Sequence, residues 1–289
     1  MAVEEIGLIG IGLLGTSLAA RLRGAGFGVG GYDQDPAAMG RLRELGGRAL
    51  ASAAEVTTSC RRIVLSLPGP ADVEGTVVLM EPVLTAGAII LDTTTGDPTS
   101  VEALARRLAD RGVTFLDATI GGSSRQVAAG EAIVVCGGAG AAFEACHDIL
   151  SCFGRAAFHT GAAGTGTRMK LVMNLALGLH RAVLAESLEF ARRNGIDPAE
   201  ALEILRRGPS YSRVMDTKGD KMLRRDFAPE ARLAQHLKDV RLILQTGAAA
   251  GARLPLSEVH QTLLEEAVEM GHGDDDNSAV IQVFAREKA

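Results

Sequence analysis

Lys170 and Asn174 are residues whose types and spacing suggest proton chemistry. They stand four positions apart in GTGTRMKLVMN (164–174), so on a helix both side chains lie on one face. A lysine held against an apolar surface beside another positive charge gives up its proton more readily than one in water. Such a group can act as a general acid or base. A lysine extended along a half-exposed helix is the structural alternative, and these residues alone leave both interpretations open.

A second pattern, G-x-G-x-x-G, occupies residues 10–15 and follows the apolar run Ile6–Ile9. Gly10 allows a tight turn, Gly12 lets the backbone approach a pyrophosphate, and Gly15 lets the helix pack closely on the strand. The positions between them are Ile11, Leu13 and Leu14. We therefore predict a dinucleotide site whose phosphates meet free N–H groups at the start of a helix.

Asp33 is the second part of that prediction, because it follows the next apolar run and lies 18 residues after Gly15. A carboxylate at this spacing bonds a ribose 2′-hydroxyl and repels a 2′-phosphate. Gln34 and Asp35 follow it, and no arginine does. The pattern favours NAD over NADP. A structural turn followed by a surface acid explains neither the spacing nor the position near the N-terminus.

Small residues also gather in DATIGGSSRQVAAGEA (117–132), at a strand-to-helix junction. Gly121 and Gly122 can offer only backbone N–H groups, and Ser123 is the first side-chain donor after them. A loop of small residues at a helix start forms an anion-binding concavity. We expect these three residues to receive a substrate carboxylate.

Composition limits the possible functions. The chain has 289 residues, 47% of them hydrophobic, with a net charge of −5, few aromatic residues and no tryptophan. These features argue against a nucleic-acid partner, which needs positive charge and stacking platforms. We expect no membrane span, because charged residues interrupt the apolar runs, and we see no targeting segment. Four cysteines without a C-x-x-C pair indicate buried thiols in a cytoplasmic protein and no metal site. The DDD run at 274–276 is interpreted as a solvated turn.

The elements that position these residues change type along the chain. Up to about residue 160, short apolar runs alternate with helical patterns, which indicates a doubly wound parallel sheet of the Rossmann type. Further on, only helical patterns follow, at about 164–193, 198–207, 231–251 and 255–271. We expect a dinucleotide-binding domain at 1–163 and an all-α substrate and oligomerisation domain at 164–289, linked by the long first helix.

Six blocks in matching order make the sequence resemble the β-hydroxyacid dehydrogenase family, which includes 3-hydroxyisobutyrate dehydrogenase. The cofactor loop (7–22), LDTTTGDP (91–98) and DATIGGSSRQVAAGEA resemble its first three blocks. GTGTRMKLVMN, HLKDVRL (236–242) and GHGDDDNSAVI (271–281) resemble its catalytic helix, its K-D segment and its closing block.

The resemblance implies a role for individual residues. Lys170 is the expected general acid/base at the substrate oxygen, and Asn174 orients the substrate. Lys238 is expected near the nicotinamide ribose and the substrate carboxylate, with Asp239 holding its ammonium group. Thr95 is expected at the nicotinamide end of the cofactor. Leu67 and Pro68 are expected along the path of the cofactor.

The substrate block departs from the family pattern. Thr119 replaces a proline, Gly121 a serine and Ser123 a glycine, so the hydroxyl group moves from before the glycines to after them. Arg213 stands where the family tends to have a bulky apolar residue, and we hypothesise that it meets a second anionic or polar group of the substrate. A surface or interface arginine is the alternative.

Together these features predict an oxidoreductase that interconverts a small 3-hydroxy acid and its semialdehyde, with NAD preferred over NADP. The active site is expected in the cleft between the domains. The alternatives are an imine reductase-like enzyme and a non-catalytic dinucleotide-binding protein of the same fold. Lys170 and Asp33 argue against the first, and the retained Lys170, Asn174 and Lys238–Asp239 against the second. Alanine-rich helices and the resemblance favour a homodimer or homotetramer.

Overall fold

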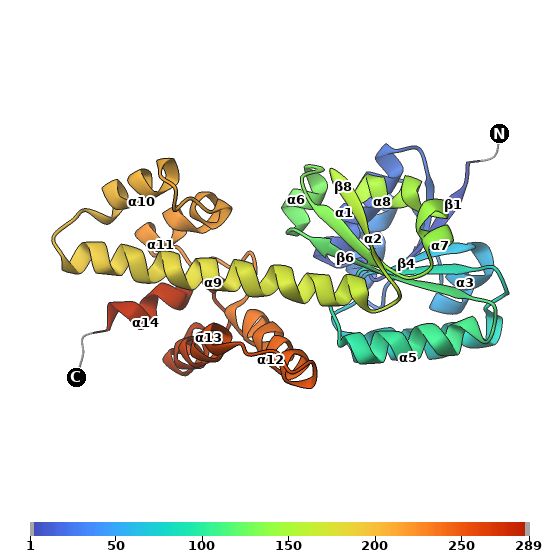
Figure 1. Cartoon of the computed structure of the whole chain (residues 1–289). Helices are drawn as coiled ribbons and strands as arrows, with labels where there is room; N and C mark the ends of the chain where they lie inside the picture. Colours follow the sequence, from blue (N-terminus) through green and yellow to red (C-terminus); the bar gives the residue numbers. More distant parts are fainter. Residues whose placement is uncertain (1–2, 287–289) are drawn as a thin grey trace. The chain divides into compact units, whose positions relative to one another are not determined.

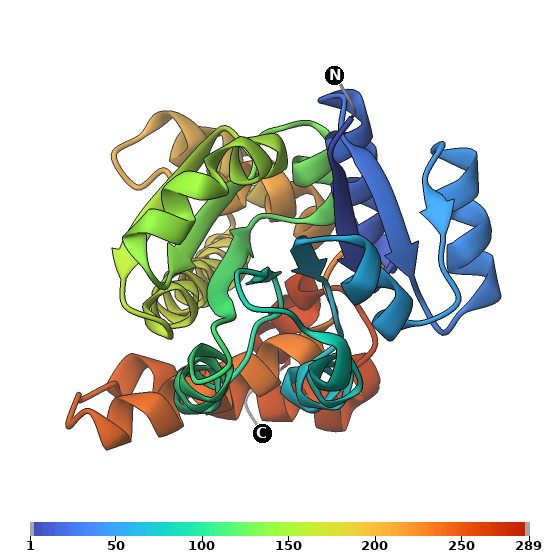
Figure 2. The same cartoon turned by 90° about the vertical axis from the view of Figure 1, so that its right-hand side faces the viewer.

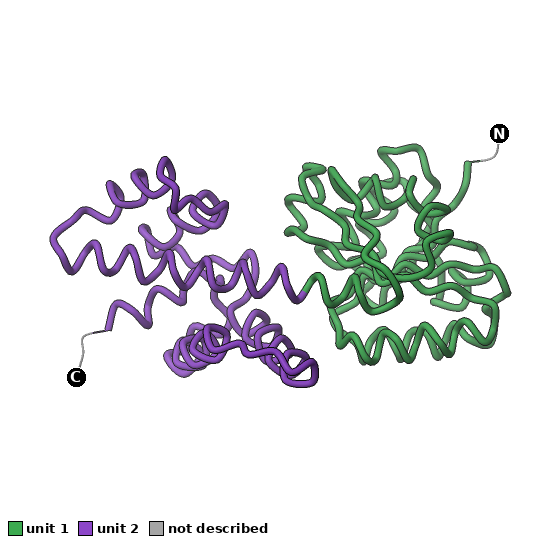
Figure 3. The backbone as a smooth tube through the Cα atoms, viewed as in Figure 1, with its two compact units in different colours: residues 1–170 green, residues 171–289 purple. Residues whose placement is uncertain are grey.

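The structure is a computed structural model that describes residues 3–286. It divides into two compact units, one ending at Lys170 and the other starting at Leu171 (Figure 3). The division falls inside the long helix α9 (Thr165–Arg193), labelled in Figure 1.

The first unit is built on one eight-stranded sheet with the order β3-β2-β1-β4-β5-β6-β7-β8, which runs from blue to green strands in Figure 2. Its strands are β1 (Glu5–Ile9), β2 (Gly28–Tyr32), β3 (Arg48–Ala49), β4 (Arg62–Leu65), β5 (Ile89–Asp92), β6 (Thr114–Gly121), β7 (Ile133–Gly137) and β8 (Ala156–Gly161). Its helices are α1 (Leu13–Gly24), α2 (Pro36–Glu44), α3 (Ala53–Ser59), α4 (Pro70–Met80), α5 (Pro98–Ala109), α6 (Ser124–Ala128), α7 (Gly140–Ala145) and α8 (His147–Phe153), with a 3-10 turn at Glu81–Val83. The predicted doubly wound fold is confirmed, and the short edge strands β3 and β8 were not predicted.

One pair of strands differs from the predicted parallel arrangement. β6 and β7 are antiparallel, whereas β7 and β8 are parallel to each other. The segment between Gly121 and Ile133 contains only the short helix α6. A parallel connection needs a crossover of a dozen or more residues, usually with a full helix, so the chain turns back here instead.

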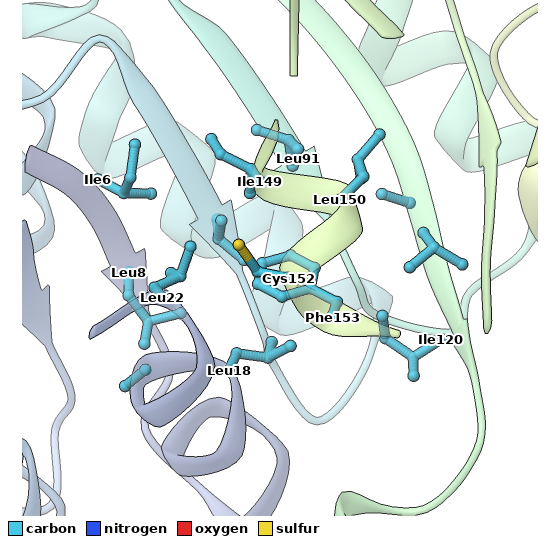
Figure 4. Packing of buried hydrophobic residues seen from close by; sticks show 14 of the residues in the cluster. Ile6, Leu8, Leu18, Leu22, Leu91, Ile120, Ile149, Leu150, Cys152 and Phe153 are labelled. Carbon is cyan, nitrogen blue, oxygen red and sulfur yellow. The ribbon is translucent and has the colours of Figure 1, made fainter. Parts of the chain in front are cut away.

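Two apolar clusters cover the two faces of this sheet, as the alternation of side chains along a strand requires. Ile6 and Leu8 of β1 belong to the cluster formed with α1 and α8, part of which Figure 4 shows. Ile9, at the end of the same strand, belongs to the cluster on the other face. Strands buried on both faces explain why the sequence reads as short continuous apolar runs.

The second unit is helical. It contains the rest of α9, α10 (Pro198–Arg207), α11 (Asp220–Arg224), α12 (Leu233–Ala249), α13 (Pro255–Ala267) and α14 (Ile281–Ala285). Two π-helical turns, Met215–Gly219 and Val268–His272, and a 3-10 turn at Asn277–Val280 complete it. The helices expected at 198–207, 231–251 and 255–271 are present, while those between residues 213 and 224 and after 276 were not predicted.

Helix α9 is long and apolar enough to cross a membrane, judged by length and composition alone. The sequence-based expectation did not identify it as such a segment. Leu184, Ala185 and Leu188 of α9 are buried in the core of the second unit, so part of its apolar surface is covered by protein. The core helix of a soluble protein passes the same test, and the feature is weak evidence for a membrane.

The interpretation of residues 274–276 as a solvated turn was wrong for Asp276, which is fully buried. Both carboxylate oxygens of Asp276 accept hydrogen bonds from the Lys218 ammonium group, at 2.8 and 2.9 Å. Burial alone would raise the pKa of Asp276, but the hydrogen bonds and charge of Lys218 lower it to about 2. The sequence around Asp276 gives no sign of burial, because Lys218, the residue that pairs with it, lies 58 residues away.

Candidate active site

The glycine loop between β1 and α1 has the geometry that its sequence predicts. Gly10 has φ of +91°, and a Cβ atom there would lie 2.2 Å from the Ser66 carbonyl oxygen. A Cβ on Gly15 would lie 2.0 Å from the Gly10 carbonyl oxygen. The first glycine therefore permits the turn, and Gly15 permits the close approach of helix and strand.

Gly12 has a different role, because a Cβ there would meet no heavy atom within 4 Å. It precedes the first turn of α1 and makes no side-chain cap. Leu13 is 85% exposed beside it, whereas Ile11 is buried and Leu14 packs against the core. An open helix start without a side-chain cap offers unsatisfied N–H groups to an anion, so the loop fits a dinucleotide pyrophosphate.

Asp33, directly after β2, is hydrogen-bonded to this loop. Its Oδ2 accepts from the Ile11 amide at 2.6 Å and its Oδ1 from the Asp35 amide at 2.8 Å. The sequence analysis missed Arg41 on α2, whose guanidinium group donates to the Ile11 carbonyl at 3.3 Å and lies 3.7 Å from Asp35. An arginine eight residues after Asp33 was the available signal. The residues directly after Asp33, Gln34 and Asp35, carry no positive charge and so give no sign of this arginine.

The loops after β4 and β5 carry the remaining predicted cofactor residues and are tied together. The Leu67 amide donates to Thr94 Oγ1 at 3.2 Å, and the Thr94 amide donates to Asp92 Oδ1 at 2.9 Å. Leu67 and Thr95 are half-buried, and Pro68 is exposed. Burial raises the pKa of Asp92 to about 7, although the hydrogen bonds from Thr94 act to lower it. Thr94 thus links the two loops and the buried Asp92 holds Thr94 in place, and the sequence analysis identified neither role.

The predicted substrate loop begins where β6 ends. Gly121 is the last residue of β6, and Gly122 and Ser123 are exposed. Ser123 caps α6: its hydroxyl accepts from the Gln126 amide at 3.3 Å, and its own amide donates to Gln126 Oε1 at 2.9 Å. This capping box occupies the groups of Ser123 that were expected to meet the substrate. A carboxylate at this amide would replace the oxygen of Gln126.

Asp117, in the middle of β6, fixes the start of α9. Its two carboxylate oxygens accept from the Gly164 amide at 2.9 Å and from the Thr167 amide at 2.6 Å. Gly166 is needed there, because a Cβ would lie 2.3 Å from the Asp117 carbonyl oxygen. The family pattern begins its substrate block with this aspartate, but the sequence analysis gave it no role.

Lys170 is held next to the predicted substrate loop. Its ammonium group donates a hydrogen bond of 2.7 Å to the carbonyl oxygen of Ile120, the residue before Gly121. The side chain is half-buried. Two blocks that are 50 residues apart in the sequence therefore meet within the first unit, and they bring an ammonium group next to the predicted substrate loop.

In the second unit, Asn174 and Asp239 form another link between predicted residues. Asn174 Nδ2 donates to Asp239 Oδ2 at 3.0 Å. Lys238 is exposed on α12, and its expected pairing with Asp239 stays a prediction. Arg213 is exposed at the start of the segment before the first π-helical turn, and its role toward a substrate also stays a prediction.

Among residues 3–286, no three or more His, Cys, Asp or Glu side chains come together in a group that could hold a metal ion. The four cysteines are buried as free thiols. Burial raises the pKa of the Cys136 thiol to about 12 and that of the Cys60 thiol to about 11. These thiols are consequently protonated and poorly reactive at neutral pH.

Comparison with known proteins agrees with this geometry. A family model described as the NAD binding domain of 6-phosphogluconate dehydrogenase matches residues 5–161. A model described as NAD-binding of NADP-dependent 3-hydroxyisobutyrate dehydrogenase matches residues 164–284. The two matches together cover both halves of the predicted site.

Individual relatives match over nearly the whole chain. L-threonate dehydrogenase from Cupriavidus necator is 30% identical over 97% of this chain and 96% of its own length. 2-(Hydroxymethyl)glutarate dehydrogenase from Eubacterium barkeri is 31% identical, with coverages of 97% and 94%. The crystal structure of 3-hydroxyisobutyrate dehydrogenase from Salmonella typhimurium has a TM-score of 0.88 at 25% identity, covering 97% and 99% of the two chains.

The fold, the glycine loop and these matches define a nicotinamide dinucleotide-binding oxidoreductase. Within that class, the chain belongs to the 3-hydroxyisobutyrate dehydrogenase-like β-hydroxyacid dehydrogenase family. The resemblance inferred from the six sequence blocks is confirmed.

Proposed function

We propose that the protein interconverts a small 3-hydroxy acid and its semialdehyde, with Lys170 as the general acid/base. The observation that carries this proposal is the 2.7 Å hydrogen bond from the Lys170 ammonium group to the Ile120 carbonyl. It places a group able to exchange a proton beside N–H groups able to bind a carboxylate. A 3-hydroxy acid carries both functions, and two carbon–carbon bonds separate its carboxylate from the carbon that bears the hydroxyl.

Each residue has a defined task in this proposal. Gly121, Gly122 and the amide of Ser123 receive the substrate carboxylate. Asn174, oriented by Asp239, donates a hydrogen bond to the substrate. Lys170 takes the hydroxyl proton during oxidation and returns it to the carbonyl oxygen during reduction. The bound dinucleotide supplies hydride exchange with the carbon that bears this oxygen.

We also propose that NAD is preferred over NADP. The loop places the carboxylate of Asp33 within 2.6 Å of the Ile11 amide, where its negative charge disfavours a 2′-phosphate nearby. Arg41 works in the opposite direction, but it is half-exposed and is already shared by Asp35 and the Ile11 carbonyl. A small carboxylate substrate, a homodimeric or homotetrameric state and a cytoplasmic location belong to the same proposal.

The test is a panel of 3-hydroxy acids and ω-semialdehydes, assayed with NAD and with NADP in both directions. The expected result is turnover of at least one 3-hydroxy acid, with a higher kcat/KM for NAD. Turnover of cyclic imines together with no turnover of any hydroxy acid would overturn the proposal. Cofactor binding without turnover of any member would contradict it as well, and would point to a non-catalytic dinucleotide-binding protein.

A further inference from the structure

Two buried acids stand side by side on neighbouring strands of the first unit. Asp92 is the last residue of β5, and it pairs in register with Asp117 of the parallel strand β6. Side chains alternate along a strand, so both acids lie on the face of the sheet that holds Ile90 and Phe115. Asp92 is 3% exposed and Asp117 is 1% exposed. The two carboxyl groups therefore share one layer of the buried core.

The hydrogen bonds of the two acids differ. The carboxylate of Asp117 accepts from two backbone amides, those of Gly164 and Thr167. In the described part of the chain, Asp92 accepts from one backbone amide, that of Thr94 at 2.9 Å. Each amide favours the charged form of the acid that it contacts, and two like charges in a buried layer disfavour each other. The pair therefore carries its negative charge mainly on Asp117 and its proton mainly on Asp92.

The surroundings of Asp92 allow this proton to exchange near neutral pH. Burial raises the pKa of Asp92 to about 7, and the charge of Asp117 acts in the same direction. A cavity of about 270 Å³ between α4 and α5 is lined by Asp92 and Thr94. The cavity gives water access to the carboxyl group, so a proton can pass between Asp92 and solvent.

The charged groups on the elements packed against the pair have other partners. Glu74 of α4 lines the same cavity and pairs with Arg107 of α5 at 2.7 Å. Arg168 of α9 pairs with Glu102 of α5 at 2.6 Å. On β7, burial and the charge of Asp117 raise the pKa of the Cys136 thiol to about 12, so this thiol stays neutral.

Three further side chains of the first unit belong to types that can titrate near neutral pH. Lys170 does so in the proposed function, and its ammonium group contacts β6 at the Ile120 carbonyl. Histidine ordinarily changes its charge in this range, and the first unit contains His147 on α8 and His159 on β8. Two strands separate β8 from β5 in the sheet. A test of Asp92 has to be distinguished from these three side chains.

Asp92 also lies at the edge of the sheet where the dinucleotide is expected. The register aligns Ile9, directly before the glycine loop, with Leu65 of β4, and Leu65 with Asp92. The ends of β1 and β5 are thus two strand spacings apart, about 10 Å. A dinucleotide crosses the carboxyl ends of the strands in such a sheet, and Asp33 after β2 marks the adenosine side. The side of β4 and β5 is left for the nicotinamide half.

We infer that the pair of Asp92 and Asp117 is a proton site linked to the oxidation state of the cofactor. Asp92 releases its proton when the oxidised dinucleotide binds and regains one when the reduced dinucleotide takes its place. The O–H bond of the Asp92 carboxyl group breaks, the proton passes to water, and no other covalent bond changes. The oxidised nicotinamide ring has a positive charge that the reduced ring lacks, so the oxidised form favours a carboxylate at Asp92. The inference goes beyond the proposed function, because it requires cofactor binding but no particular substrate.

Linkage determines the sign of the pH dependence. At pH 6 Asp92 holds a proton that binding of NAD has to displace, whereas at pH 8 the carboxylate is already charged. The affinity for NAD therefore rises with pH. We expect the Kd for NAD to be about fivefold lower at pH 8 than at pH 6, and the Kd for NADH to change by less than about twofold.

The test is titration calorimetry of the full chain with NAD and with NADH between pH 6 and pH 8. At pH 6.5, binding of NAD should release about half a proton, measured as the difference in heat between PIPES and imidazole buffers. Asp92→Asn should bind NAD with a Kd that changes by less than about twofold over this range. Asp72→Asn, which neutralises an exposed acid in the first turn of α4, is the matched control and should keep the pH dependence. Lys170→Met should keep it as well.

The other outcomes overturn the inference. Equal pH dependence for NAD and NADH in the wild type shows that the ring charge is not linked to a proton. A pH dependence that survives in Asp92→Asn assigns the proton to another group, such as a histidine. A pH dependence that disappears in Lys170→Met and not in Asp92→Asn assigns it to Lys170. All three results leave the proposed function standing, which is overturned by the substrate panel and not by these Kd values.

Asp117→Asn keeps the inference testable if Asp92→Asn does not fold. The substitution removes the neighbouring charge that helps to raise the pKa of Asp92. The pH dependence of the Kd for NAD should then move to lower pH by at least about half a pH unit. An unchanged position of this dependence overturns the coupling of the two acids.

Discussion

Asp117 holds the first turn of the helix that carries Lys170: its Oδ2 accepts a hydrogen bond of 2.6 Å from the Thr167 amide. Lys170 lies three residues after Thr167 on α9. Its ammonium group donates to the carbonyl oxygen of Ile120, which lies three residues after Asp117 on β6. The strand and the helix are therefore connected twice within one turn, once by the acid and once by the lysine. Burial raises the pKa of Asp117, while the amides of Thr167 and Gly164 oppose that rise.

Replacing Asp117 with alanine should destabilise the first unit and lower kcat. It removes the acceptor of two buried amides, and the loss of a cap together with unsatisfied donors amounts to about 2 kcal/mol. Urea unfolding measures the change in the free energy of unfolding. Asp117→Asn keeps one oxygen acceptor and should be intermediate. Equal midpoints for Asp117→Ala and wild type would show that these bonds contribute nothing.

Lys170→Met should lower kcat by at least about a hundredfold and leave the Kd for NAD unchanged, because it removes the proton carrier and keeps the apolar stem. The Kd for NAD is measured by calorimetry, and turnover is followed through the absorbance of NADH. Lys170→Arg separates the two roles of this side chain, since an arginine can donate to the Ile120 carbonyl but does not release its proton. Full activity in Lys170→Arg would contradict the acid/base role.

Gly12→Ala should fold normally and lose affinity for the cofactor. A Cβ at this position meets no heavy atom within 4 Å in the protein, but it occupies the space that a pyrophosphate needs. We expect a Kd for NAD at least about tenfold higher, with a change in the free energy of unfolding of less than about 0.5 kcal/mol. Gly24→Ala, also in open space but in the last turn of α1, is the matched control and should leave the Kd unchanged. Equal Kd values for Gly12→Ala and wild type would place the pyrophosphate elsewhere.

Asp33→Asn should move the preference from NAD toward NADP. The substitution removes the charge that repels a 2′-phosphate and keeps an oxygen that can accept from the Ile11 amide. Arg41, already near the Ile11 carbonyl, can then pair with the phosphate. The ratio of kcat/KM for NADP to that for NAD should rise about tenfold or more. An unchanged ratio would exclude Asp33 as the selecting charge.

The stability of the protein should fall as the pH rises from about 4 to about 7, through Asp92. Its pKa is raised by burial from 3.8 to about 7 in the folded protein, so the native state binds more protons than the unfolded state across that range. The contribution is fully present below pH 4 and lost as the pH rises through 7. Asp92→Asn should flatten this part of the Tm profile while the rest of the profile is kept. A profile that is identical in Asp92→Asn would assign the slope to other groups.

The sequence predicted those parts of the site that depend on neighbours in the chain. Gly10, Gly12 and Gly15 could be assigned roles because a turn is a local structure, and Asp33 because one strand separates it from the loop. The burial of Arg181 could not be predicted, since an arginine in a helical pattern gives no sign of being buried. The pairing of Lys218 with Asp276 was missed for a similar reason, because it joins segments 58 residues apart.

The strands of the sheet show the same difference between features that depend on neighbouring residues and features that depend on distant ones. Apolar runs located six of the eight strands, because strands buried on both faces have that pattern. The reversed direction of β7 could not be read from its residues, which look like those of a parallel strand. It follows from the length of the connection after β6, and the short α6 that fills it has too few residues for a helical pattern to appear.

The reversal of β7 has a consequence for how the enzyme can be altered. Because β8 runs parallel to β7, the chain leaves the sheet near Asp117 and then follows β6 toward Ile120. The number of residues in β6 between Asp117 and Gly121 therefore determines which residue of α9 lies beside Gly121. Each residue inserted between Thr167 and position 170 would turn the following side chains by about 100°. New specificities are accordingly easier to obtain by changing the loop after Gly121 than by changing the length of this helical turn.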